Sequence, residues 1–258
     1  MDVVKFTETI FSNNNKKGVL TPDSDGYYTV MLGGLNTYNS AGEYYVATGA
    51  VEIFQNSSHF MRRVNNGALY SELGHPKRQP GMGLEDFYRR IVTIDESNIC
   101  AHISEVWLDF NFGKSHPEIG NPEFVAIMGK VKPAGPKASG LELSFQNPKE
   151  NTAFSIRGLT ENHDRNGRTE RCLTEVITFD NVPEPGIFTS CKADNPATEA
   201  LQVVEASDVY VNKDILRSTL QSLTKSNRMA TESDRALYNQ ILGSLRTDSP
   251  ASSRLSRW

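Results

Sequence analysis

The sequence predicts an α+β protein that is mainly β, with a body of short strands followed by a helical C-terminal region. Segments rich in Val, Ile, Tyr, Phe and Thr fill the first two-thirds of the chain, and clusters of Asn, Gly, Asp and Pro separate them. From about Asn212 onward, leucines recur at helical spacing instead. The 258 residues suffice for one large domain or a domain with an appendage.

The predicted strands show partial alternation of apolar and polar residues, which is typical of strands with one buried face. They are residues 3–9, 26–32, 43–54, 89–94, 99–110, 123–131 and 171–179. Residues 133–151 are rich in Gly, Pro and Ala, which favours a loop with room for one short helix.

The C-terminal region contains two predicted helices. Leu216, Leu220 and Leu223 form one apolar stripe, and Leu237, Ile241 and Leu245 form a second. The polar end of the chain predicts disorder. We therefore divide the chain into a body, residues 1–207, and a helical C-terminal region, residues 208–258, which includes the polar tail.

Composition favours a soluble intracellular protein. The chain carries 27 basic and 31 acidic residues, and the excess of acid lies in the body, which argues against specific nucleic-acid binding. Apolar runs are too short to span a bilayer, so no membrane association is expected. Cys100, Cys172 and Cys191 form no C-x-x-C pair, which indicates a reducing compartment.

The histidine of "ALYSELGHP" is a candidate base. His75 lies between a glycine and a proline after a possible strand, and this peptide by itself favours a residue of a surface loop. The chain contains no H-E-x-x-H, phosphate-binding or G-x-S-x-G motif, and His102 and His116 lack metal-ligand spacing. We therefore expect no metal and no cofactor.

"NTAFSIRGL" contains a candidate nucleophile. In a strand, Phe154 and Ile156 point to the core, while Ser155 and Arg157 share the other face. Ser155 is either a polar residue on a solvated face or a nucleophile, which needs a neighbouring base. Asp180 ends an apolar strand, where a buried carboxylate requires a partner.

These segments together resemble a known family. "GALYSELGHP", then "FSIRGL", then "VITFDNVPEPG" resembles the tailed-phage prohead proteases, serine proteases related in fold to assemblin, the capsid-assembly protease of herpesviruses. The resemblance covers roughly residues 67–186. It implies a closed antiparallel β-barrel surrounded by helices, and barrel closure would remove exposed strand edges.

The resemblance also implies residue roles. His75 would be the base, Ser155 the nucleophile and Asp180 the acid that orients the histidine. The oxyanion or substrate-binding site would lie near Arg157 and Gly158, or near residues 186–189.

The family resemblance implies cleavage after glutamate during capsid maturation, inside the assembling prohead in the host cytoplasm. Scaffold and major capsid proteins would be substrates, and a homodimer formed through the helices is a further hypothesis. The chain would also cut itself, with candidate bonds between Glu232 and Ser233 and between Glu205 and Ala206.

Two alternatives remain at this stage. The chain could be a non-catalytic scaffold or prohead core protein on the same fold, or an unrelated β protein whose motifs match by accident. A separation of more than about 6 Å between the side chains of His75 and Ser155 would favour the scaffold interpretation.

Overall fold

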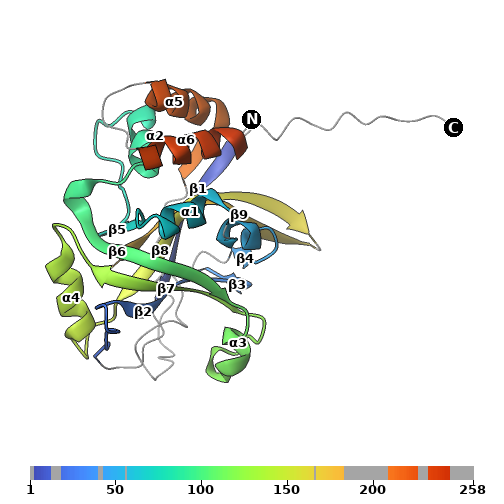
Figure 1. Ribbon diagram of the computed structural model, residues 1–258. Helices are drawn as coiled ribbons and strands as arrows, with labels where there is room; N and C mark the ends of the chain where they lie inside the picture. The colour runs from blue at the N-terminus through green and yellow to red at the C-terminus, as the bar shows by residue number, and fades with distance from the viewer. Residues whose placement is uncertain are drawn as a thin grey trace.

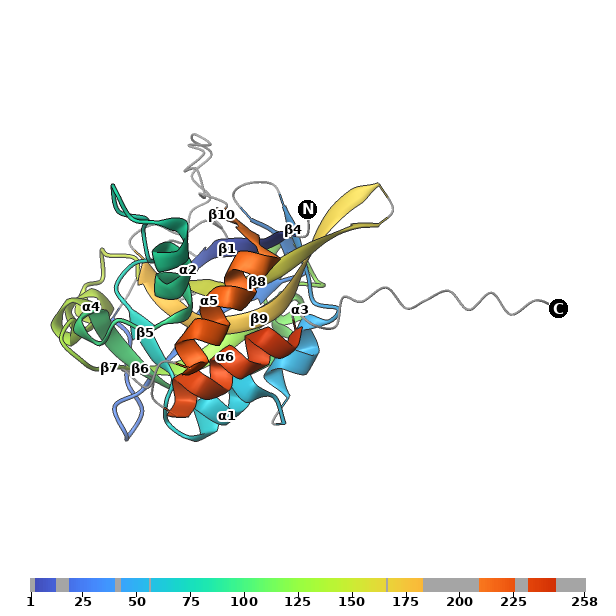
Figure 2. The ribbon, with the colours of Figure 1, turned by 90° about the horizontal axis from the view of Figure 1, so that it is seen from above.

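The computed structural model describes residues 3–12, 19–39, 43–55, 57–165, 167–182, 209–225 and 232–244. Two sheets form the body, and α2, α5 and α6 lie together at one end of the molecule (Figure 1). Seen from above, α5 and α6 lie side by side, with α2 next to α5 and α1 next to α6 (Figure 2). None of the helices in these ranges is long and apolar enough to cross a bilayer.

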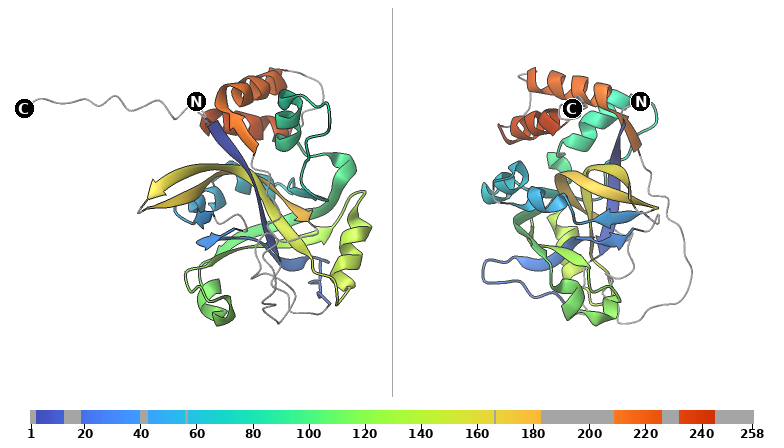
Figure 3. Two further views of the ribbon diagram at one scale, coloured as in Figure 1. Left: turned by 180° about the vertical axis from the view of Figure 1, so that it is seen from behind. Right: turned by 90° about the vertical axis from the view of Figure 1, so that its right-hand side faces the viewer.

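The first sheet has six strands in the order β10-β1-β8-β9-β4-β3. Its pairings are antiparallel except for the parallel pair of β4 and β9. The long hairpin of β8 and β9 extends beyond the rest of the sheet (Figure 3). The strands are β1 (Val3–Ser12), β3 (Thr37–Tyr38), β4 (Tyr44–Val46), β8 (Ala153–Arg165), β9 (Arg168–Val182) and β10 (Val209–Asn212).

The second sheet has four antiparallel strands in the order β2-β7-β6-β5. They are β2 (Tyr28–Leu35), β5 (Tyr70–Glu72), β6 (Ile99–Asp109) and β7 (Val125–Pro133). A single parallel bridge from Leu73 to Asn181 joins this sheet to β9. The short strand β5 leads directly into the loop that carries His75.

Helices cover the sheets on several sides. The α-helices are α1 (His59–Asn65), α2 (Leu84–Val92), α3 (Phe112–Ser115), α4 (Ala138–Gln146), α5 (Lys213–Lys225) and α6 (Glu232–Ser244). The 3₁₀ helices are η1 (Ala50–Phe54), η2 (Glu96–Asn98) and η3 (Pro117–Ile119).

The α+β class is confirmed, but the predicted closed barrel is wrong for the described strands, which form two separate sheets. The physical reason is that β5 spans only three residues, and the backbone pairing with β9 is limited to one bridge from Leu73, the residue after β5. At the opposite edge of the second sheet, β2 pairs with β7 alone.

One predicted strand is also wrong. Residues 89–94 lie mostly in α2, whose buried residues Phe87, Tyr88, Ile91 and Val92 recur at helical spacing. The β-branched residues Ile91 and Val92 at the end of this helix favoured a strand. The apolar face that they share with Phe87 and Tyr88 has helical spacing instead.

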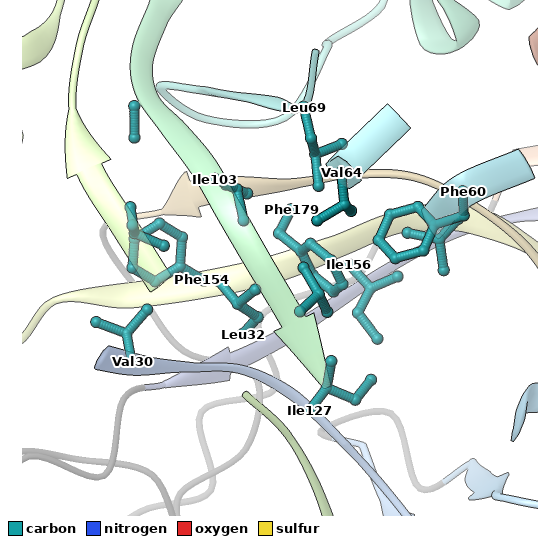
Figure 4. Close-up of a cluster of buried hydrophobic side chains, with 14 of the residues drawn as sticks. Val30, Leu32, Phe60, Val64, Leu69, Ile103, Ile127, Phe154, Ile156 and Phe179 are labelled. Carbon is teal, nitrogen blue, oxygen red and sulfur yellow. The ribbon is translucent and has the colours of Figure 1, made fainter. Parts of the chain in front are cut away.

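The main core lies between the two sheets. Phe154, Ile156 and Phe179 extend from β8 and β9 toward Val30, Leu32, Ile103 and Ile127 of the second sheet (Figure 4). The expectation that Phe154 and Ile156 are core residues is confirmed, since neither side chain is exposed. Because side chains alternate along a strand, Ser155 and Arg157 point to the opposite face of β8.

A second core lies on that opposite face, beneath the C-terminal helices. Leu159 of β8 and Ile177 of β9 pack with the buried face of α2 and with α5 and α6. The helices contribute Leu216, Leu220, Leu237, Tyr238, Ile241 and Leu242. The described residues of the predicted apolar stripes therefore pack against the body. Leu245, the boundary at residue 207 and the polar tail fall outside the described residues.

Replacing a leucine of α5 tests whether this second core stabilises the fold. Leu220 is fully buried, so Leu220→Ala should lower the free energy of unfolding by about 3 kcal/mol. Leu143→Ala is the matched control, because Leu143 is 67% exposed, and it should cost under about 1 kcal/mol. Urea denaturation measures both. Equal stabilities of the two variants would contradict the packing described here.

A buried carboxyl of β9 makes stability depend on pH. Burial raises the pKa of Glu175 from its ordinary 4.5 to about 8, although the charge of Arg63 opposes the rise. Its carboxyl contacts the side-chain amide of Gln240 on α6. A raised acid pKa means that the folded state keeps a proton that the unfolded state loses, so stability falls as pH rises from about 4.5 to 8.

We expect Glu175→Gln to remove this loss, which amounts to several kcal/mol at about 1.4 kcal/mol per pKa unit. Thermal or urea unfolding between pH 5 and 8 would show a flatter dependence on pH and a more stable variant at pH 8. Glu142→Gln on the exposed face of α4 serves as control and should retain the wild-type slope. A Glu175→Gln protein with an unchanged slope would exclude this carboxyl as the cause.

Candidate active site

The hairpin of β8 and β9 brings Ser155 and Asp180 together. The two residues lie directly opposite each other in the antiparallel register, so their side chains share a face. That face is the one turned away from the main core. Both residues are fully buried. A pair separated by 25 positions in the sequence thus becomes adjacent through strand pairing alone.

The loop after β5 places His75 beside this pair. The amide of Gly74 donates to the carbonyl oxygen of Asn181 at 2.6 Å, which attaches the loop to the end of β9. Gly74 has a φ of 75°, a backbone conformation that favours glycine. This turn explains why the histidine follows a glycine, and it directs the imidazole toward β8 and β9.

Asp180, His75 and Ser155 form a continuous hydrogen-bonded chain. Nδ1 of His75 lies 2.8 Å from Oδ2 of Asp180, and Nε2 lies 2.6 Å from Oγ of Ser155. An ionised carboxylate only accepts hydrogen bonds, so Nδ1–H is the donor to Asp180. Nε2 is then the acceptor for the serine hydroxyl. The imidazole has the tautomer that a general base for Ser155 requires.

Arg157 keeps the carboxylate of Asp180 ionised. Its Nε donates to Oδ2 at 2.8 Å and its Nη2 to Oδ1 at 2.6 Å, a bidentate pair. Burial alone would raise the pKa of Asp180, but the charge of Arg157 and the hydrogen bonds from His75 and Arg157 hold that pKa below its usual range. Asp180 can therefore orient the imidazole and stabilise an imidazolium.

The guanidinium of Arg157 is turned toward two buried carboxylates, those of Asp180 and Glu72. Its side chain is fully buried, and its remaining contacts are Glu72 and the carbonyl oxygens of Ile91 and Thr93. This geometry supports the carboxylate of Asp180, and the assignment of Arg157 to an oxyanion or substrate-binding site stays a prediction.

Gly158 has a packing role in the hairpin. A Cβ at this position would lie 2.4 Å from the carbonyl oxygen of Glu175, so the close approach of β8 and β9 requires glycine. The assignment of Gly158 to an oxyanion site stays a prediction, and residues 186–189 lie outside the described residues.

Of the predicted self-cleavage residues, only Glu232 and Ser233 fall within the described part of the chain. Glu232 and Ser233 begin α6, and Glu205 and Ala206 lie outside the described residues. His102 binds Tyr27 and the carbonyl oxygen of Gly67 instead of joining the triad. In the part of the chain that the structure describes, no group of three or more His, Cys, Asp or Glu side chains could hold a metal ion.

Sequence reasoning missed three residues near the site. Glu72, Arg90 and Asn98 form a polar cluster behind Arg157, in which Glu72 is fully buried and the other two are half-buried. The position of Glu72 was a weak signal. It is an acidic residue in a possible strand, three positions before the candidate base His75, and such a residue needs a partner if it is buried. Arg90 and Asn98 gave none, since their side chains meet Glu72 only through tertiary packing.

The chain is similar to known proteases. Residues 6–241 match the Peptidase S80 family. A capsid maturation protease of Pseudomonas phage phiKZ is 39% identical over 209 residues, which cover 78% of this chain and 75% of that protein. The solved capsid assembly protease of bacteriophage T4 aligns with a TM-score of 0.49 and 13% identity, over 70% of this chain and 99% of that one.

The family match spans most of the chain and includes every residue of the Asp180–His75–Ser155 arrangement. The chain belongs to the Peptidase S80 family and is a serine protease.

Proposed function

We propose that this protein is a capsid maturation protease with Ser155 as nucleophile, His75 as general base and Asp180 as orienting acid. The observation that carries the proposal is the hydrogen-bonded chain from Asp180 through His75 to Ser155, with distances of 2.8 Å and 2.6 Å. The similarity to the phage phiKZ capsid maturation protease supports the biological setting.

The proposed reaction follows from the geometry. Oγ of Ser155 attacks the scissile carbonyl carbon while its proton passes to Nε2 of His75. The imidazolium then gives this proton to the leaving amine, which releases the first product and leaves an acyl-enzyme. Water, deprotonated by His75, hydrolyses the ester. Asp180 holds Nδ1–H throughout and stabilises the positive ring.

Ser155 is buried in this structure, and the side chain of His75 is 5% exposed. A peptide carbonyl must reach within bonding distance of Oγ, so binding of a substrate requires the surrounding chain to move. Restricted access of this kind suits a protease that acts only inside the assembling prohead.

We propose scaffold and major capsid proteins as substrates, cleaved after glutamate. The chain would also process itself at Glu232–Ser233 or at Glu205–Ala206. The first of these bonds lies in the first turn of α6, which must unwind before the chain can enter a protease site in extended form. A symmetric homodimer formed through the helices is a further part of the proposal.

A separation of more than about 6 Å between the side chains of His75 and Ser155 would have favoured the non-catalytic scaffold hypothesis. Their hydrogen bond of 2.6 Å removes that argument.

Replacement of the nucleophile tests the assignment. Ser155→Ala should lower the rate of cleavage of a scaffold-protein substrate by roughly 10⁴-fold or more, because no other described group takes the place of its hydroxyl. Ser144→Ala is a matched control, since Ser144 is also buried and hydrogen-bonded, but to Thr152. It should keep activity within a few-fold. Near-normal cleavage by folded Ser155→Ala would exclude this triad.

Intact-mass spectrometry of purified protein over time tests self-processing. The wild type and Ser144→Ala should lose residues 233–258 or residues 206–258, while Ser155→Ala stays whole. The fragment mass identifies the bond. Equal trimming of Ser155→Ala would show that another protease makes the cut, and the self-cleavage proposal would then be abandoned.

A further inference from the structure

Glu72 is a buried carboxylate behind the triad that the proposed reaction does not use. It lies on β5, three residues before His75, and its side chain is fully buried. Its Oε1 lies 2.9 Å from Nη2 of Arg157, the same nitrogen that binds Oδ1 of Asp180 at 2.6 Å. Nη2 of Arg157 thus contacts both the carboxylate of Asp180 and that of Glu72.

The other side of Glu72 is held by α2 and the segment that follows it. Nη1 of Arg90 donates to Oε1 at 3.0 Å, and Nη2 of Arg90 pairs with Oε2. The amide of Asp95 donates to Oε1 at 3.0 Å, and the side-chain amide of Asn98 donates to Oε2 at 3.2 Å. This set satisfies both oxygens of a carboxylate that would otherwise be costly to bury.

The same segment holds Arg157. Nη1 of Arg157 donates to the carbonyl oxygen of Thr93 at 3.1 Å and approaches that of Ile91 at 3.4 Å. Carbonyl oxygens at the C-terminal end of a helix are free to accept and carry partial negative charge. The end of α2 therefore orients both arginines of the network.

The network is balanced in charge. Asp180 and Glu72 supply two negative charges, and Arg157 and Arg90 supply two positive charges. His75 faces it from the loop, and Asp95 lies at its edge with Oδ2 4.0 Å from Nη2 of Arg90. Removal of the charge of Glu72 or of Arg90 therefore changes the net charge near the imidazole without replacing a residue of the triad.

Cys100 on β6 is a further titratable group close to this network. Its thiol contacts Ser71, the neighbour of Glu72 on β5. Burial raises the pKa of Cys100 to about 12, with a smaller contribution from the charge of Asp180. The thiol is therefore neutral in the working pH range and leaves the charge balance unchanged.

We propose that Glu72 and Arg90 are positioning residues for proteolysis, which act through Arg157 to fix the orientation and charge environment of Asp180. They thereby determine the net charge that faces the imidazole of His75 while it accepts the proton of Ser155. This inference rests on the triad assigned above.

Two substitutions with opposite charge effects test the inference. Glu72→Gln leaves an excess positive charge, which disfavours the imidazolium, so the acid limb of the kcat/KM profile should move to lower pH. Arg90→Met leaves an excess negative charge and should move that limb to higher pH. We expect shifts of roughly 0.5 to 1 pH unit, a fall in kcat of about tenfold and a nearly unchanged KM, since neither residue touches substrate.

The double variant Glu72→Gln/Arg90→Met restores the charge balance and should return the limb toward its wild-type position. Arg89→Met is the matched control on α2, because Arg89 is 45% exposed and its nearest partner is Glu85 at 3.9 Å. It should change neither the limb nor kcat. Circular dichroism of every variant reports whether it is folded.

Arg90→Lys keeps the charge but loses the bidentate geometry, so it should lower kcat without moving the limb. Arg90 is 24% exposed, so its replacement should disturb folding less than replacement of the fully buried Glu72. The Arg90 variants therefore test the inference even if Glu72→Gln does not fold. An unmoved limb in folded Arg90→Met, or shifts of the same sign in both single variants, would overturn the inference. Persistent activity of Ser155→Ala would instead refute the triad itself, so the two failures are distinguishable.

Discussion

The bidentate ion pair between Arg157 and Asp180 is buried on the face of β8 and β9 that also carries Ser155. An unpaired carboxylate at this position would take up a proton or destabilise the fold, and it could not orient an imidazole. The guanidinium keeps the charge in place, and the strand register keeps Ser155 opposite it. The histidine loop, β5 and the end of α2 are arranged around this pair.

The C-terminal helices α5 and α6 support the Arg157–Asp180 ion pair indirectly, because they pack against α2. Ile91 packs in the second core with Leu220 and Ile241, and its carbonyl oxygen lies near Nη1 of Arg157. The helices that sequence reasoning treated as a separable region thus stabilise the element that holds the arginines. Cleavage after Glu232 would cut Leu237, Tyr238 and Ile241 from the chain against which they pack.

The two faces of the β8–β9 hairpin differ in chemistry: one is apolar and the other carries charged and catalytic groups. One face supplies Phe154, Ile156 and Phe179 to a core between sheets (Figure 4), where dispersion and apolar burial dominate. The other face carries the charged groups and is closed by helices rather than by a sheet. This division lets a polar network with strict geometry lie next to a conventional core.

Local sequence determined much of the catalytic hairpin. Alternation along residues 151–159 was enough to predict that Ser155 and Arg157 share a face opposite Phe154 and Ile156, because side chains in any strand alternate. The leucine spacing of α5 likewise predicted its buried stripe. The roles of His75, Ser155 and Asp180 came from a family resemblance, and the structure places these three side chains within hydrogen-bonding distance.

Only the tertiary structure decided how the two sheets are arranged and which residues surround the triad. The closed barrel was a wrong prediction because the length of β5 and the single bridge from Leu73 to β9 depend on how the chain turns toward His75. The guanidinium of Arg157 could point to substrate or to Asp180, and only packing selected Asp180. Glu72 and Arg90 are 18 residues apart, and a strand and a helix have no common periodicity that would reveal their contact. Side-chain alternation is a local property of the backbone, whereas a buried charge network exists only where separate elements bring its members together.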